Sequence, residues 1–211
     1  MKGRLITLEG GEGAGKSTVL EAVRERLEAQ GVRVLVTREP GGTPLGEAVR
    51  ALVLDPKLKG LSSESELLLM FASRAQLVRE TIRPALEAGT WVLSDRFTDA
   101  SYAYQGGGRG LPVERIAELG RWAVGLRPDL TLLLDLPIED GLARMGSRGE
   151  ADRIERESRA FFERVRAAYR ERAAAEPARF RVIDASRPVG EVRDAASAAI
   201  DAYVAGLEVR A

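Results

Sequence analysis

The chain has 211 residues, 45% of them hydrophobic and 30% charged, and its 32 basic and 32 acidic residues give a formal net charge of +0. This composition is typical of one globular domain, and the balanced charge gives no reason to expect a nucleic-acid or anionic-membrane partner. The absence of cysteine excludes disulfides, thiol catalysis and thiolate metal sites. Because histidine is also absent, any proton transfer or metal binding must use carboxylates, hydroxyls, Lys, Arg or water. No apolar run approaches the ~20 residues of a membrane span. The N-terminus enters a predicted strand almost at once, so we expect a cytoplasmic protein without a signal peptide.

The first predicted strand, over residues 5–8, leads into a glycine-rich segment and then into a helix over about residues 16–30. The segment matches the phosphate-loop pattern Gly-x-x-x-x-Gly-Lys-[Ser/Thr] at every fixed position, in the strand–loop–helix context that the pattern requires. Backbone N–H groups and the helix N-terminus would surround phosphates there. We expect Lys16 to reach the β- and γ-phosphates and Ser17 to ligate Mg²⁺. The predicted ATP contacts here are Gly10, Gly11, Glu12, Gly13, Ala14, Gly15, Lys16, Ser17 and Thr18.

Strands and helices alternate along the rest of the chain. Further strands are predicted over residues 32–37, 91–94, 130–136 and 180–184, and helices over about 45–54, 64–88, 112–125, 137–145, 155–176 and 188–207. Pro84 is expected to kink the longest helix. Residues 98–105 fit either a loop or a short helix, and the glycine run at 106–110 predicts a flexible loop. The pattern predicts one α/β domain over residues 1–211, with a five-stranded parallel sheet, helices on both faces and ligands outside the carboxyl ends of the strands.

A phosphate loop alone leaves several functions open. GTPase switches usually carry an Asn/Thr-Lys-x-Asp motif, and no lysine follows Lys59. A small kinase needs an acceptor site, residues that hold the acceptor's phosphate and a mobile arginine lid, and the chain has candidates for all three. The alternatives are a kinase for a different nucleoside monophosphate, a P-loop ATPase or switch that acts on a protein, and a nucleotide-binding module without catalysis.

Six segments, in order along nearly the whole chain, resemble thymidylate kinase of the common bacterial type. They lie at residues 9–17, 37–43 (Thr-Arg-Glu-Pro-Gly-Gly-Thr), 95–97 (Asp-Arg-Phe), 103–109 (Ala-Tyr-Gln-Gly-Gly-Gly-Arg), 127–131 (Arg-Pro-Asp-Leu-Thr) and 152–155 (Asp-Arg-Ile-Glu). The second and fourth are the most specific. The resemblance implies the P-loop nucleoside monophosphate kinase fold and phosphoryl transfer from ATP to dTMP with Mg²⁺, giving dTDP for dTTP synthesis. It also implies a homodimer.

The resemblance assigns several residues to dTMP. It places Glu12 against the 3′-hydroxyl, Arg38 and Glu39 near acceptor and metal, and Arg50 and Arg96 on the acceptor's phosphate.

For the nucleoside, the resemblance implies an aromatic ring stacked on thymine and Arg74 bonded to the base edge. In the family that aromatic usually lies four residues before the arginine, where this chain has Met70; Phe71 lies three before and shares the helix face, so Phe71 is the candidate. Ser101, Tyr104 and Gln105 match positions that line base and sugar, and Tyr104 would crowd the 2′ position.

Metal and transition-state roles also follow from the resemblance. Asp95 resembles an aspartate that organises Mg²⁺ through water. Some members carry the catalytic arginine inside the phosphate loop, where this chain has Gly13. A lid at about residues 146–155 is therefore expected to supply it, with Arg153 the best match and Arg144 and Arg148 near ATP. Lys16, Asp95, Arg96 and Arg153 are the predicted catalytic residues.

Overall fold

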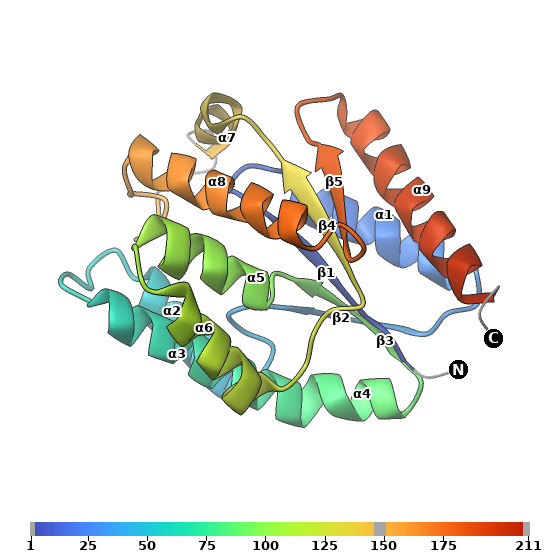
Figure 1. Ribbon diagram of the computed structural model, residues 1–211, viewed down its shortest axis with the longest axis horizontal. Coiled ribbons are helices and arrows are strands. Elements are labelled where there is room, and N and C mark those ends of the chain that lie inside the picture. Colours follow the sequence, from blue (N-terminus) through green and yellow to red (C-terminus); the bar gives the residue numbers. More distant parts are fainter. Residues whose placement is uncertain (1–2, 146–150, 209–211) are drawn as a thin grey trace.

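Five parallel strands in the order β2-β3-β1-β4-β5 run through the centre of the molecule (Figure 1). The structure is a computed structural model that describes residues 3–145 and 151–208. The strands are β1 (Leu5–Gly10), β2 (Val34–Arg38), β3 (Trp91–Asp95), β4 (Leu130–Asp135) and β5 (Phe180–Asp184). Because β1 is central and pairs in parallel with β3 and β4, the carboxyl ends of these strands meet at one edge of the sheet. The predicted α/β architecture is confirmed.

Helices connect the strands. They are α1 (Lys16–Glu28), α2 (Pro44–Leu54), α3 (Ser63–Leu77), α4 (Arg83–Glu87), α5 (Thr98–Ser101), α6 (Val113–Leu119), α7 (Ile138–Met145), α8 (Arg159–Ala175) and α9 (Val189–Glu208). Three stretches of wider π-helical winding continue from α3, α5 and α6: η1 (Val78–Ile82), η2 (Tyr102–Gly108) and η3 (Gly120–Val124).

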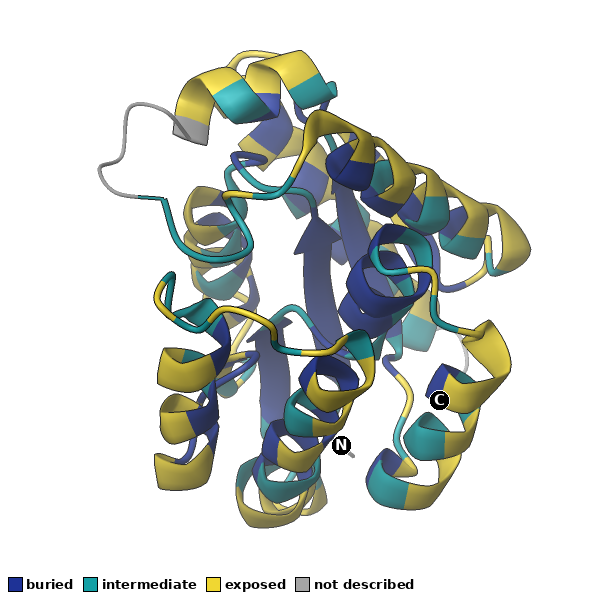
Figure 2. Cartoon of the chain, turned by 90° about the vertical axis from the view of Figure 1, so that its left-hand side faces the viewer, coloured by how far each residue is buried: buried dark blue, intermediate teal, exposed yellow. Residues whose placement is uncertain are grey.

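Alternate residues of β1 pack into hydrophobic layers on opposite faces of the sheet. Ile6 and Leu8 pack in the layer that contains α1 and α9, which lie side by side in Figure 1. Leu5 packs on the opposite face with residues of α3 and η1. Leu133 of β4 packs with α8 on that same side. Figure 2 shows the result: the strands and the inner faces of the helices are buried, and the outer faces of the helices are exposed.

The predicted helix over residues 64–88 is three consecutive segments, α3, η1 and α4. Pro84 lies in the first turn of α4 and has no N–H to donate to the preceding turn. A wider turn just before it accommodates the proline ring, so the proline is absorbed by a change of winding.

The prediction of a flexible loop at residues 106–110 is wrong for most of that segment. Residues 98–108 are helical, through α5 and η2, and η2 packs along α8. A Cβ at Gly107 would lie 2.7 Å from the Ala168 Cβ and 2.8 Å from the Arg164 carbonyl oxygen. A Cβ at Gly108 would lie 2.4 Å from the ring of Phe161. These glycines permit close helix packing.

Candidate active site

A pocket opens at the carboxyl ends of β1, β2 and β3. Its lining includes the phosphate loop (residues 12–18) and an opposite group of residues, which we call the far wall. The far wall consists of Arg38, Glu39, Pro40, Arg50, Val53, Leu54, Glu66, Met70, Tyr104 and Gln105. Asp95, Arg96 and residues 152–154 also line the pocket. The topology therefore gathers most of the predicted site residues in one place.

The phosphate loop depends on glycines in left-handed conformations. Gly13 has φ +71°, and a Cβ there would lie 2.6 Å from the Gly141 carbonyl oxygen, so α7 packs directly on the loop. Gly15, at φ +83°, precedes α1. The Lys16 side chain points toward the start of the loop, where its ammonium donates to the carbonyls of Gly10 at 3.2 Å and Gly11 at 3.0 Å. Burial and the neighbouring Arg96 guanidinium lower the pKa of Lys16.

Glu12 faces Arg96 and Tyr104. Its Oε1 accepts hydrogen bonds from Arg96 Nη2 at 2.6 Å and from the Tyr104 hydroxyl at 2.9 Å. Burial opposes ionisation of Glu12, but Arg96, followed by Lys16 and the Tyr104 hydrogen bond, outweighs it and lowers the pKa of Glu12 to about 2. The carboxylate is therefore ionised, and its Oε1 is held by Arg96 and Tyr104.

Arg96 is held from several sides at the end of β3. Its φ is +70°, the only positive value for a non-glycine residue within residues 3–145 and 151–208. Its Nη1 donates to the Gly10 carbonyl at 3.2 Å and to the Tyr169 hydroxyl at 3.3 Å, and its guanidinium lies 4.7 Å from the centre of the Tyr104 ring. Such backbone strain persists only where the surroundings enforce it and is common at functional sites.

Asp95 carries a buried carboxylate oxygen, Oδ1, that has no hydrogen-bond partner within the described part of the chain. Asp95 and Ser17 line the same pocket. The described residues contain no group of three or more His, Cys, Asp or Glu side chains that could hold a metal. The Asp95 carboxylate and the Ser17 hydroxyl nevertheless fit Mg²⁺, which commonly keeps several waters and binds through one or two protein oxygens plus phosphates.

The residues after β2 differ in exposure. Arg38 is exposed and donates to Glu47 at 3.0 Å, whereas Arg50 is half-buried and donates to the Pro40 carbonyl at 3.1 Å. Glu39 is buried and accepts from Arg74 Nε at 2.6 Å. Burial, only partly opposed by Arg74, raises the pKa of Glu39 to about 7. Its Oε1 has no hydrogen-bond partner among the described residues.

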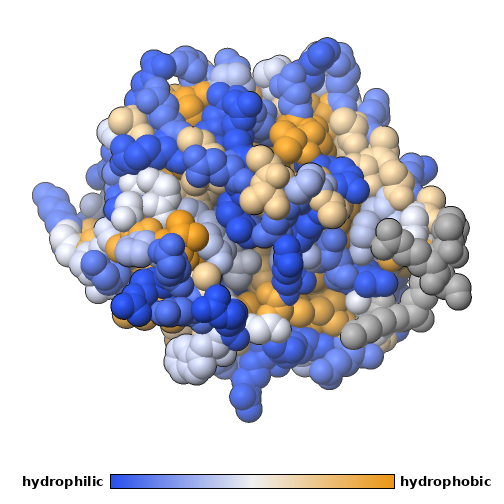
Figure 3. All heavy atoms as spheres, viewed as in Figure 1, coloured by the Kyte–Doolittle hydropathy of each residue, from blue (hydrophilic) through white to orange (hydrophobic). Residues whose placement is uncertain are grey.

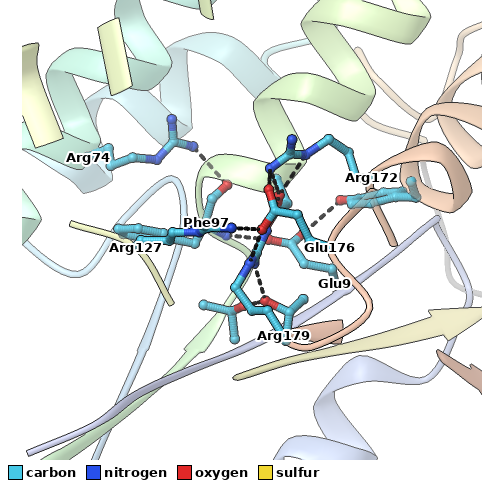
Figure 4. Close-up of polar contacts among 11 residues, drawn as sticks. Glu9, Arg74, Phe97, Arg127, Arg172, Glu176 and Arg179 are labelled. Carbon is cyan, nitrogen blue, oxygen red and sulfur yellow. Dashed lines mark hydrogen bonds and ion pairs between the residues drawn. The ribbon is translucent and has the colours of Figure 1, made fainter. Parts of the chain in front are cut away.

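Arg74 and Ser101 lie behind the far wall. Arg74 has no exposed surface and donates to the Ser101 hydroxyl at 3.0 Å. It also donates to the Phe97 carbonyl at 3.1 Å (Figure 4). The lining of the pocket contains neither residue.

The structure corrects the placement of Phe71. Phe71 is 2% exposed, packs in the core and lies under the Arg74 guanidinium at 4.7 Å, whereas Met70 lines the pocket. Adjacent residues of an α-helix point about 100° apart, so Phe71 can face the core while Met70 faces the pocket. The family spacing of four residues before the arginine would have identified Met70.

The lid arginines have different surroundings. Arg144 donates to the carbonyls of Gly13 at 3.2 Å and Ala185 at 3.3 Å, and so joins α7 to the phosphate loop. Arg153 donates to the Val53 carbonyl at 2.7 Å and to Glu66 at 2.5 Å. Arg148, like the rest of residues 146–150 of the predicted lid, lies outside the described residues.

Sequence reasoning missed Glu9, Glu66 and Tyr169. Glu9 is buried beneath the phosphate loop, where it accepts from the Phe97 N–H and the Tyr169 hydroxyl, each at 2.7 Å (Figure 4). Burial, with the neighbouring Asp99, raises the pKa of Glu9 to about 8. In the sequence, Glu9 stands between the apolar run of residues 5–8 and the phosphate-loop motif, and this position favours burial at the site. Glu66 and Tyr169 carry no comparable local signal.

Comparison with known proteins shows the family. The thymidylate kinase family model matches residues 8–196. The chain belongs to the thymidylate kinase family. A thymidylate kinase of Pseudomonas savastanoi pv. phaseolicola is 59% identical over 194 residues, covering 92% of each chain. One of Ectopseudomonas mendocina is 57% identical, covering 98% of this chain and 97% of the relative, and one of Pseudomonas fluorescens is 54% identical, covering 100% and 99%.

The face in Figure 3 is mostly hydrophilic, with apolar residues in separate clusters. No helix within the described residues has the length and apolar character needed to cross a membrane.

Proposed function

We propose that this member of the thymidylate kinase family transfers the γ-phosphoryl group of ATP to dTMP, giving dTDP and ADP. The observation that carries the proposal is the Glu12–Arg96–Tyr104 cluster, which lies in the same pocket as the phosphate loop. A P-loop ATPase acting on a protein has no need of this cluster at its nucleotide. The family supports the same conclusion.

We assign ATP to the phosphate loop. The backbone N–H groups of the loop and the start of α1 would bind the phosphates. The Lys16 ammonium now bonds two loop carbonyls, and it would exchange them for phosphate oxygens. Ser17 would hold Mg²⁺ directly and Asp95 would do so through water. The ion would supply neutralisation of phosphate charge.

We assign dTMP to the far wall. Arg50 and Arg96 would bind its phosphate, because a guanidinium suits two phosphate oxygens at once. Glu12, ionised and fixed by Arg96, is available to the 3′-hydroxyl, and the ring of Tyr104 would exclude a 2′-hydroxyl. Met70 takes over the base-facing role that the sequence assigned to Phe71.

The reaction then needs no covalent enzyme intermediate. An oxygen of the dTMP phosphate attacks the γ-phosphorus, a new P–O bond forms, and the bond from that phosphorus to the bridging oxygen of ADP breaks. Arg96 holds the attacking phosphate in line while Lys16 stabilises the charge on the transferred group. Positioning and electrostatic stabilisation of this kind provide nearly all of the catalysis in phosphoryl transfer.

We also propose a homodimer, formed through the exposed apolar side chains of α3, α6 and η3. Leu68 is 57% exposed, Val113 52% and Trp122 84%. Leu68 and Trp122 line a shallow hollow together with Leu67, Arg115, Glu118 and Leu119. Large apolar side chains that cluster on a surface mark an interaction site. Sedimentation of the wild type and of Trp122→Glu tests this: the wild type should sediment as a dimer and the variant as a monomer.

A location in the cytoplasm stays a prediction from the sequence.

The activity is tested by an acceptor panel of dTMP, dUMP, dCMP, AMP and GMP with ATP and Mg²⁺. We expect the highest kcat/KM for dTMP. A higher value for another monophosphate would make the chain a kinase of different specificity. ATP hydrolysis that ignores every monophosphate would support the ATPase alternative.

A further inference from the structure

Glu66, in the first turn of α3, accepts hydrogen bonds from three side chains in two other parts of the chain. Its side chain is 2% exposed. It accepts from Gln105 Nε2 at 2.8 Å, from Arg109 Nη2 at 3.0 Å and from Arg153 Nη2 at 2.5 Å. Glu66, Gln105 and Arg153 all line the pocket. One buried carboxylate therefore joins α3, η2 and residues 151–157 beside the proposed dTMP site.

The charge on Glu66 is compensated at close range. Burial opposes its ionisation, but hydrogen bonds from Arg109, Gln105 and Arg153 outweigh burial and lower the pKa of Glu66. Arg109 also pairs with Glu157 at 2.5 Å, so two carboxylates and two guanidiniums alternate. Removing one member of such a buried set leaves its partners uncompensated, at a cost larger than that of an exposed ion pair.

Arg153 carries this network to the end of α2. Its N–H donates to the Leu54 carbonyl at 3.1 Å and its Nε donates to the Val53 carbonyl at 2.7 Å. The last carbonyls of a helix have no partner within the helix, and a cation there also interacts favourably with the helix dipole. Arg153 thus caps α2, whose residues Arg50, Val53 and Leu54 form part of the far wall.

We propose that Glu66 is a positioning residue for the acceptor: its carboxylate fixes Gln105 and Arg153, and through Arg153 the end of α2, so that the far wall is preformed for dTMP. The inference rests on the proposed function. Glu66 acts through other side chains and takes no part in the chemical step. Its loss should therefore weaken dTMP binding in the ground state and the transition state alike.

The test compares Glu66→Gln, which keeps the shape and removes the charge, with Glu157→Gln. Glu157 is a matched control because it also pairs with Arg109, while its side chain is 27% exposed and Arg109 is its hydrogen-bond partner among the described residues. We expect Glu66→Gln to raise KM for dTMP about tenfold, the low end of the effect of one charge-assisted hydrogen bond. Its kcat should stay within about twofold of the wild type, as for lost uniform binding. KM for ATP should not change.

Amide hydrogen exchange provides a readout that does not depend on activity. Residues 152–157 should exchange faster in Glu66→Gln than in the wild type or in Glu157→Gln. The Arg153 side chain is then held less firmly by residue 66, so the hydrogen bond from the Arg153 N–H to the Leu54 carbonyl opens more often. An unchanged KM for dTMP, an equal rise of KM in Glu157→Gln, or unchanged exchange would overturn the inference. If Glu66→Gln does not fold, Arg153→Lys replaces it. Lysine has a single nitrogen in place of the separate Nε and Nη2 that bond Val53 and Glu66, so its hold on the two groups is weaker and the same KM change is expected. If the wild type does not phosphorylate dTMP, the proposed function fails, and the exchange measurement alone decides whether Glu66 holds Arg153.

Discussion

Gly107 offers a sharp test of how the acceptor wall is built. It lies in η2 between Gln105 and α8, and a Cβ there would stand 2.7 Å from the Ala168 Cβ and 2.8 Å from the Arg164 carbonyl oxygen. The backbone of α8 cannot yield as the end of a flexible side chain can. In Gly107→Ala, η2 must therefore shift away from α8, and it carries Tyr104 and Gln105 with it.

The magnitude follows from two opposing effects. Glycine to alanine in a compatible conformation stabilises by about 0.4–1 kcal/mol through the unfolded chain. Overpacking a tight contact costs about 1–3 kcal/mol. We expect a net loss of about 1–2 kcal/mol, which lowers Tm by roughly 2–8 °C for a chain of this length.

The assay is thermal unfolding together with kcat/KM for dTMP. Gly206→Ala in α9 is the control, because a Cβ at that exposed helical position meets nothing within 4 Å. The control should be as stable as the wild type or slightly more stable. A Gly107→Ala protein with wild-type Tm and wild-type kcat/KM would refute the packing argument and restore the flexible loop.

Three further predictions concern single side chains. Arg153→Ala should raise KM for dTMP, while kcat falls less than about tenfold. A kcat loss of about 10³-fold, as for an arginine finger, would instead give Arg153 the transition-state role. Arg148→Ala, measured in the same way, shows whether the large loss of kcat occurs at Arg148. Tyr104→Ala should narrow the kcat/KM preference for dTMP over its ribose counterpart, and an unchanged ratio would leave Tyr104 only a packing role. Burial raises the pKa of Glu9 from 4.5 to about 8, so the folded protein keeps a proton that the unfolded chain releases, and the free energy of unfolding should fall as pH rises from about 5 to 8. Glu9→Gln should make this fall smaller in urea titrations across that range, and an identical slope would contradict the raised pKa.

The fold could be predicted because its signals are local. Apolar runs alternate with helical patterns, and the phosphate-loop motif fixes the geometry between β1 and α1. The glycine run at 106–110 was misread because composition cannot show that α8 passes within contact distance. Phe71 was chosen by residue type, although the direction of its side chain is set by the neighbouring core.

The side-chain partnerships of the site could not be read from the sequence. Arg74 and Glu39 are 35 residues apart, and Arg153 and Glu66 are 87 apart. Every such pair is one of many possible pairings among 32 basic and 32 acidic residues. The motifs show which residues gather at the sheet edge, and only the tertiary structure shows which carboxylate neutralises which arginine.

The central claim is that ATP turnover at the phosphate loop serves dTMP. The most direct measurement is ADP release from ATP and Mg²⁺, with and without dTMP, by the wild type and by Lys16→Ala. We predict that dTMP accelerates ADP release many-fold in the wild type, with one dTDP formed for each ADP, and that Lys16→Ala keeps the wild-type Tm and loses nearly all turnover. ADP release that is independent of dTMP, or near-normal turnover by a folded Lys16→Ala protein, would contradict the account.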